Sequence, residues 1–335
     1  EAEVCYKKVI ELKPDHLRIY YNLAALLDGQ NRKDEAEKYY QKAIQIHPND
    51  KEALINKGQI LFNKGEYERA LRDFDTCNNK SSRAHALVCL YNLGRINDIY
   101  QRIEKNNQLD EKNLSVAAFS SFISHKEKKD TANKFCNKPI NFIYYSNLSS
   151  HLENANYFIT EVIEELKNVE STWEPYNRTT RKGYASNHNL FRNPLEKMNN
   201  LKTIILNEIT LYQIKFKEEL CSFIQKWPLK YELTSWQVIL KQQGFQTSHI
   251  HPEAWLSGVI YLKTVPTLNK DEGAIEFSLN GYLYSDPKSP KVIYNPSLGD
   301  MVLFPSSLYH KTIPFTSDVD RIIVSFDLVP KNFDN

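Results

Sequence analysis

The spacing of apolar residues changes along the chain and predicts helices first and strands later. Through the first third, apolar residues recur every three to four positions, which is typical of amphipathic helices. Helical spacing returns over residues 158–169 and 195–227, with a loop expected between them at 181–191. From Tyr231 onward, β-branched and aromatic runs separated by Gly, Pro and Asn predict short strands joined by turns.

The helical first third contains an internal repeat. Residues 17–50 and 51–83 align at an offset of about 34 positions. Equivalent positions hold similar residues: Ala24 and Gly58, Leu27 and Leu61, Ala36 and Ala70, Tyr40 and Phe74, and Ala43 and Cys77. Small residues let two helices approach closely, and an aromatic residue one turn later fills the same face. This pattern resembles the tetratricopeptide repeat.

The repeats predict an α-solenoid, because each unit buries its apolar stripe only against its neighbours. Residues 1–16 have the pattern of a second repeat helix, and a weaker copy covers 84–113. A capping helix is expected within 114–135, before the composition shifts to β-branched and aromatic residues. The expected domains are therefore 1–135 and 136–335. The resemblance implies that the array binds a protein or peptide, although a spacer or dimer scaffold is the other reading.

Composition and charge narrow the functional classes. The 335 residues carry 43 basic and 41 acidic side chains, so the sequence offers no charge bias toward nucleic acid or a membrane surface. No apolar run approaches the roughly 18 residues that a membrane span needs. The five cysteines lack a C-x-x-C pair, which favours a reducing, cytoplasmic location. We expect neither nucleic acid nor a membrane as a partner.

Candidate chemistry lies in the last third. On a strand, residues two apart point to the same face, so His249 and His251 can meet at one point. His310 follows a predicted strand and a proline, and Arg321 and Ser325 share one face of the closing strand. Three imidazoles suit Fe, Zn, Cu or Ni, and a guanidinium fork suits a carboxylate. The pair of histidines alone fits a hydrogen-bonded pair equally well.

Taken together, these motifs resemble a known family. Residues from about 140 to 330 contain "HIHP", "SGVIYL", "GAIEF", "FPSSLYHKTIP" and "RIIVSF" in one collinear order. They are similar to 2-oxoglutarate–Fe(II) oxygenases related to prolyl hydroxylases. The resemblance implies a double-stranded β-helix, or jelly roll, with flanking helices, giving an α+β chain of two domains. The union with tetratricopeptide repeats is similar to collagen prolyl hydroxylases and aspartyl β-hydroxylases, which act on proteins.

The resemblance also implies roles for individual residues. His249 and His310 correspond to iron ligands, and Arg321 corresponds to the residue that pairs with the far carboxylate of 2-oxoglutarate. Tyr261 is expected to hydrogen-bond the same carboxylate, and Ser325 to make a third contact. The implied cofactors are Fe(II) and 2-oxoglutarate, and the implied activity is hydroxylation of a protein or peptide side chain. No catalytic side chain is expected beyond the metal centre.

His251 departs from the family pattern, in which many relatives have aspartate or glutamate at this position. Three hypotheses follow. His251 is itself a metal ligand, or it stands behind the ligands and leaves a position open, or Glu253 or Glu276 supplies the carboxylate. Strand geometry favours the first.

Two other functions compete with the oxygenase. A cupin shares the jelly roll and the H-x-H start, but there a glutamate follows after three or four residues, whereas Glu253 follows after one. A non-catalytic interaction scaffold with a degenerate jelly roll is the second.

Overall fold

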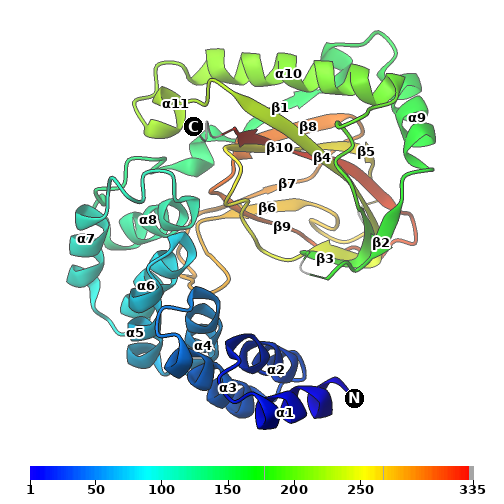
Figure 1. Ribbon diagram of the computed structural model, residues 1–335. Helices are drawn as coiled ribbons and strands as arrows, with labels where there is room; N and C mark the ends of the chain where they lie inside the picture. The colour runs from blue at the N-terminus through cyan, green and yellow to red at the C-terminus, as the bar shows by residue number, and fades with distance from the viewer. Residues whose placement is uncertain (177, 267, 332–335) are drawn as a thin grey trace. The chain divides into compact units, whose positions relative to one another are not determined.

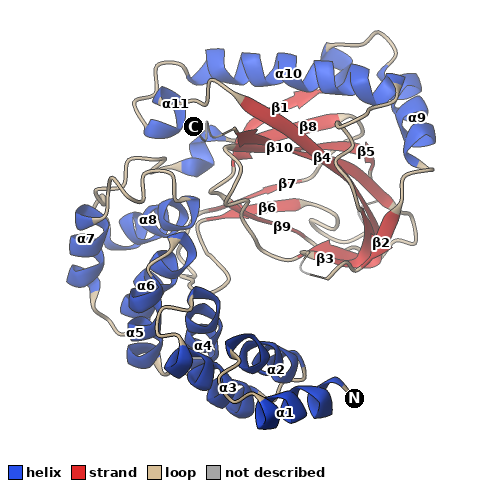
Figure 2. Cartoon of the chain, viewed as in Figure 1, coloured by secondary structure: helices blue, strands red, loops and turns tan. Residues whose placement is uncertain are grey.

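The computed structural model describes residues 1–176, 178–266 and 268–331, and it divides the chain into two compact units (Figure 1). In the first unit, Glu1–Asp110, the regular secondary structure is all helical. The second unit, Glu111–Asn335, is built on antiparallel sheets. The expected α+β chain of a repeat array followed by a jelly-roll domain is confirmed. Figure 2 shows the change from helices to strands along the chain.

The first unit is a series of helix pairs. Its helices are α1 (Ala2–Leu12), α2 (Leu17–Gly29), α3 (Lys33–Ile46), α4 (Lys51–Asn63), α5 (Tyr67–Cys77), α6 (Lys80–Asn92) and α7 (Ile96–Lys105). Each expected repeat position is buried, including Leu27, Ala36 and Tyr40. Gly58 is needed for the close packing of α4 on α5, because a Cβ there would lie 2.6 Å from Cε1 of Phe74.

The second unit combines two antiparallel sheets with flanking helices. The strands are β1 (Tyr144–Asn147), β2 (Ser171–Trp173), β3 (Thr180–Ser186), β4 (Tyr231–Gln246), β5 (Leu256–Lys263), β6 (Ile275–Ser278), β7 (Lys291–Tyr294), β8 (Asp300–Pro305), β9 (Tyr309–Thr312) and β10 (Arg321–Pro330). The larger sheet has the order β1-β8-β5-β10-β4-β3-β2, and the smaller has β7-β6-β9. The helices are α8 (Leu114–Glu127), α9 (Ala155–Leu166), α10 (Glu196–Phe216) and α11 (Ser222–Gln225), with 3-10 turns η1 (Pro139–Phe142) and η2 (Leu148–Ser150).

Strand β10 lies inside the larger sheet, paired with β4 on one side and β5 on the other. Its alternate residues face different environments. Val324, Phe326 and Leu328 pack into the core beneath α9 and α10, which cover one face of the sheet (Figure 1). Arg321 and Ser325 face the other way, toward a cavity between the two sheets.

Three local expectations were wrong. The chain divides after Asp110 rather than near 136, because α8 belongs to the second unit and its Leu114 and Ala117 join that unit's core. Residues 180–186 form strand β3 instead of a loop. The helix expected over 195–227 ends at Phe216, and α11 is a separate short helix.

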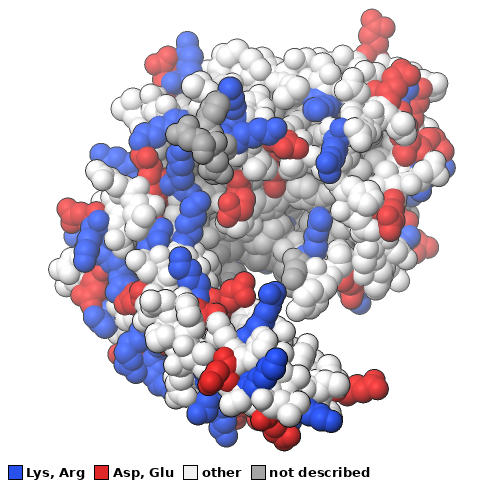
Figure 3. Space-filling model, viewed as in Figure 1, with Lys and Arg blue, Asp and Glu red and all other residues white. Residues whose placement is uncertain are grey.

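Charged side chains of both signs are spread over the face of each unit that Figure 3 shows. In the first unit, Arg69 pairs with Glu37 at 2.7 Å, and in the second, Lys241 pairs with Asp320 at 2.6 Å. Exposed pairs of this kind contribute at most about 1 kcal/mol each, so they do not specify the fold. Among the described residues, none of the helices combines the length and apolarity required of a membrane span.

Candidate metal centre

Three histidines that are far apart in sequence meet between the two sheets. His249 and His251 follow the end of β4, and His310 lies on β9 of the smaller sheet. His249 and His310 form an antiparallel bridge, in which each backbone N–H donates to the other's carbonyl oxygen at 3.1 Å. The backbone N–H of His251 donates to the carbonyl of Ser306 at 3.0 Å. Backbone hydrogen bonds therefore fix the main chain at all three histidines, and with it the position from which each side chain leaves.

The three imidazoles converge. The ring of His249 lies 4.3 Å from that of His310, and the ring of His251 lies 5.1 Å from each of the other two, between centroids. One nitrogen of each ring lies within 4.8 Å of the others, which is the spacing of ligands around a single metal ion.

In each of the three rings, Nδ1 is hydrogen-bonded to an oxygen atom. The carbonyl of Thr247 lies 2.6 Å from Nδ1 of His249, and the carbonyl of Leu308 lies 3.1 Å from Nδ1 of His310. Asp327 supplies the equivalent oxygen to His251. A carbonyl or carboxylate accepts, so Nδ1 carries the proton and Nε2 keeps its lone pair. This arrangement is usual for metal-binding histidines, and these donors fit a divalent metal such as Fe(II).

Burial keeps the imidazoles of His249 and His310 uncharged. Burial, with repulsion from His251, lowers the pKa of His249 to about 4. Burial and the two neighbouring histidines hold the pKa of His310 well below its ordinary value. Both rings are therefore neutral at pH 7, which is the form that binds a metal.

The expected 2-oxoglutarate residues line the same cavity. Tyr261, Arg321 and Ser325 line it together with the three histidines. This inner cavity measures about 20 Å³, and it shares Trp236 and Gln246 with an outer cleft of about 300 Å³. His249 and His251 also line both, so the outer cleft adjoins the histidine group.

The guanidinium of Arg321 is buried, and two of its three nitrogens have no hydrogen-bond acceptor among the described residues. Its side chain is 2% exposed, and its Nε and Nη1 have no hydrogen-bond acceptor among the described residues. The guanidinium lies 4.9 Å from the ring centre of Tyr261, whose hydroxyl is also buried and unpaired. Burial lowers the pKa of Arg321 and raises that of Tyr261 to about 12. A cation and a hydroxyl left unpaired in one cavity fit an incoming carboxylate.

The expected substitutes for a missing carboxylate ligand do not join the histidines. Within the described part of the chain, neither Glu253 nor Glu276 belongs to the group of close ligand atoms. Glu276 pairs with Lys311 at 3.1 Å. It points away from the centre, because the next residue, Phe277, is the one that stands opposite His310. Glu253 is exposed and lines the outer cleft.

One site residue was missed from the sequence. The carboxylate of Asp327 lies 2.8 Å (Oδ1) and 2.7 Å (Oδ2) from Nδ1 of His251. Asp327 is two residues after Ser325 on β10, so the same alternation that grouped Arg321 with Ser325 extends to it. Continuing that alternation by one step was the available signal.

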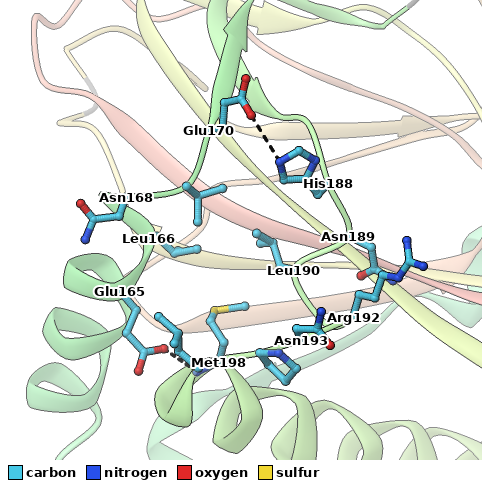
Figure 4. Close-up of a pocket in the computed structure, with 13 residues that line it drawn as sticks. Glu165, Leu166, Asn168, Glu170, His188, Asn189, Leu190, Arg192, Asn193 and Met198 are labelled. Carbon is cyan, nitrogen blue, oxygen red and sulfur yellow. Dashed lines mark hydrogen bonds and ion pairs between the residues drawn. The ribbon is translucent and has the colours of Figure 1, made fainter.

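A larger cavity of about 630 Å³ lies elsewhere in the second unit, between the end of α9 and the start of α10 (Figure 4). Its histidine, His188, is exposed and pairs with Glu170 at 3.4 Å. The start of α10 there is already capped, because Glu165 accepts hydrogen bonds from the backbone N–H groups of Lys197 and Met198. This cavity holds no metal-ligand cluster among the described residues.

Comparisons with known proteins give separate matches in the two units. Residues 234–327 match the family model described as "Putative 2OG-Fe(II) oxygenase", and residues 17–50 and 39–72 match tetratricopeptide repeat models. Both halves of the expected resemblance are thereby confirmed. The human and mouse proteins named "Protein O-mannosyl-transferase TMTC3" are 38% and 37% identical to this chain over 57 residues. That stretch is 17% of this chain and 6% of theirs.

Two solved structures show more distant likeness. A prolyl-4-hydroxylase from Pseudomonas putida is 13% identical, with a TM-score of 0.40, over 57% of this chain and 93% of its own. YrrB, described as a TPR protein with an unusual peptide-binding site, is 20% identical, with a TM-score of 0.32. That match covers 36% of this chain and 66% of YrrB.

Proposed function

We propose that this chain is a 2-oxoglutarate- and Fe(II)-dependent dioxygenase that hydroxylates a protein or peptide side chain. In this proposal His249, His251 and His310 hold the metal, and Arg321, Tyr261 and Ser325 hold 2-oxoglutarate. The repeat array recruits the substrate or a partner protein.

One observation carries the proposal: a buried guanidinium, two of whose nitrogens lack acceptors among the described residues, shares a cavity with three converging imidazoles. A buried cation without an acceptor is costly, and it is retained where a ligand completes it. The guanidinium of Arg321 suits one carboxylate of a keto diacid. The three histidines line the same cavity, so a metal held by them would bind the keto end of that acid. A cupin or a plain scaffold has no use for this arginine.

The side chains of the site bind, orient and exclude water. Together, bound Fe(II), 2-oxoglutarate and dioxygen supply the oxidising chemistry, which yields succinate and carbon dioxide and places one oxygen atom in the substrate. Arg321 and Tyr261 fix the far carboxylate, so the keto end of the acid points toward the histidines. Ile275 and Phe304 line the inner cavity and keep bulk water away. Substrate approaches through the outer cleft, past Trp236 and Gln246.

An anaerobic titration tests the cofactor assignment. Adding Fe(II) and then 2-oxoglutarate to the full chain is expected to give a weak visible charge-transfer band. Arg321→Gln is expected to require a much higher 2-oxoglutarate concentration, and His310→Ala to give no band. Arg192→Gln is the matched control, because Arg192 is exposed and lines the other cavity. Absence of the band in the unaltered protein would leave the scaffold or a zinc cupin as the better description.

The substrate class is tested by mass spectrometry. Proteins retained by His310→Ala are incubated with the active enzyme, Fe(II), 2-oxoglutarate and oxygen. A peptide that gains the mass of one oxygen atom with the unaltered enzyme, and not with Arg321→Gln, identifies the substrate. Succinate production that no captured protein stimulates argues for a small-molecule substrate instead.

A further inference from the structure

We propose that Asp327 is a positioning residue of the metal centre. Its carboxylate supplies, one hydrogen bond behind His251, the negative charge that a ligand set made only of imidazoles lacks. The inference rests on the proposed function for the identity of the metal, and on the histidine geometry for its site.

The charge around Asp327 points to a cation. The residue is 9% exposed, and within the described residues its carboxylate contacts the imidazole of His251 and the hydroxyl of Ser257. Among the residues that the structure describes, no lysine or arginine pairs with the carboxylate, and an uncompensated buried charge is costly. A divalent cation on the far side of His251 would balance it. The carboxylate of Asp327 therefore lacks a balancing cation until a metal binds, just as the guanidinium of Arg321 lacks acceptors until a carboxylate binds.

Asp327 is held in place from behind. Ser257 donates its hydroxyl to Oδ1 of Asp327 at 2.6 Å, and the hydroxyl of Ser306 lies 2.8 Å from that of Ser257. Ser257 and Ser306 are at most 1% exposed, and Ser257 stands directly opposite Asp327 in the β5–β10 pairing. Since the backbone N–H of His251 donates to the carbonyl of Ser306, one buried network fixes both the ring and its carboxylate.

Asp327 stands behind the ligand and is not itself a ligand. The two nitrogens of an imidazole lie on different edges of the ring, and Asp327 occupies the Nδ1 edge of His251. Its oxygens are outside the group of ligand atoms formed by the three histidines. The other two rings have neutral carbonyls at Nδ1, so His251 alone has an anionic partner. An anionic acceptor makes the imidazole a stronger donor to a metal, which assigns His251 to the ligands.

Cobalt titration of the metal-free full chain tests this role, with Co(II) absorption as the readout and no 2-oxoglutarate present. Asp327→Asn keeps an oxygen that accepts from Nδ1–H but removes the charge, and Asp327→Ala removes both. We expect Asp327→Asn to weaken Co(II) binding about 10- to 100-fold and to shift the Co(II) bands. Asp300→Asn is the matched control, because Asp300 is equally buried on the same sheet and contacts none of the histidines.

Each outcome decides the question. Asp327→Asn binding Co(II) like the unaltered protein, with unshifted bands, overturns the proposal. If circular dichroism shows that Asp327→Asn does not fold, Ser257→Ala is tested in its place. We expect Ser257→Ala to lose less Co(II) affinity than Asp327→Asn would, and an unchanged Co(II) affinity would count against the proposal. Because no keto acid is present, failure of 2-oxoglutarate to bind would overturn the proposed function and leave this test intact.

Discussion

Replacing Arg321 by methionine should make the ligand-free second unit more stable. Arg321 leaves two buried nitrogens, Nε and Nη1, without an acceptor among the described residues, and each costs about 1–3 kcal/mol. Stacking of the guanidinium on Tyr261 offsets about 2 kcal/mol of this. Methionine has a similar volume and no polar atoms that need partners. We therefore expect a gain of about 2 kcal/mol, which raises Tm by about 4–8 °C for a unit of this size.

Binding of 2-oxoglutarate should reverse the order of the melting temperatures of the unaltered protein and Arg321→Met. With Fe(II) and 2-oxoglutarate at about 100 times its Kd, the unaltered protein gains about 2.7 kcal/mol, because ligand binds only the folded state. Arg321→Met has lost the group that grips the far carboxylate, so its Tm should not respond to 2-oxoglutarate. The unaltered protein then melts at or above the variant, whereas without ligand it melts below it.

Tryptophan fluorescence is the appropriate measurement. All four tryptophans, at positions 173, 227, 236 and 255, lie in the second unit, so thermal unfolding followed by fluorescence reports on that unit. Melts are recorded anaerobically with Fe(II), with and without 2-oxoglutarate. Arg192→Met serves as the control for removing an exposed arginine. A lower Tm for ligand-free Arg321→Met, or equal responses of both proteins to 2-oxoglutarate, would refute the reasoning.

Three other changes have expected outcomes. Gly258→Ala should destabilise the second unit by about 1–3 kcal/mol in urea unfolding, because the new Cβ would lie 2.2 Å from Cζ of buried Phe326; a smaller loss would mean that the ring gives way. A hydrogen bond from Cys136 lowers the pKa of Cys221 to about 7, so alkylation of Cys221 should accelerate as pH rises through about 7. In Cys136→Ala the acceleration should move to higher pH, and an unchanged profile would contradict this. Trp236 lines both cavities, so 2-oxoglutarate should alter the fluorescence of the protein but not of Trp236→Phe.

Alternation along strands was the most informative property of the sequence. It indicated that His249 and His251 point the same way and that Arg321 and Ser325 share a face, and the structure brings all four to one cavity. It did not identify the oxygen against each Nδ1. Two of these oxygens are backbone carbonyls, which carry no residue-type signal. The third belongs to Asp327, whose partner is 76 positions away in the chain.

The features that the sequence did not predict depend on contacts between distant segments. Strand β3 breaks the usual pattern, because Lys182 has a φ of 48° and the β3–β4 register shifts between Arg181 and Gly183. Gly183 lies so close to β4 that a Cβ would be 2.5 Å from the carbonyl oxygen of Ile239. A glycine in that position suggests a loop until the neighbouring strand is known.

Strand β10 unites the two ends of the site. Positions 321 and 325 face the inner cavity and position 327 lines the outer cleft, so one strand carries the group for the keto acid and the carboxylate behind His251. Their spacing is fixed because β10 pairs with β4 along its whole length and with β5 along most of it. Residues 324, 326 and 328 anchor the opposite face in the core. A shift of one residue in this register would bury the charges in the core and expose the apolar side chains to the cavity. Folding of the core and assembly of the site are therefore specified by the same alternation.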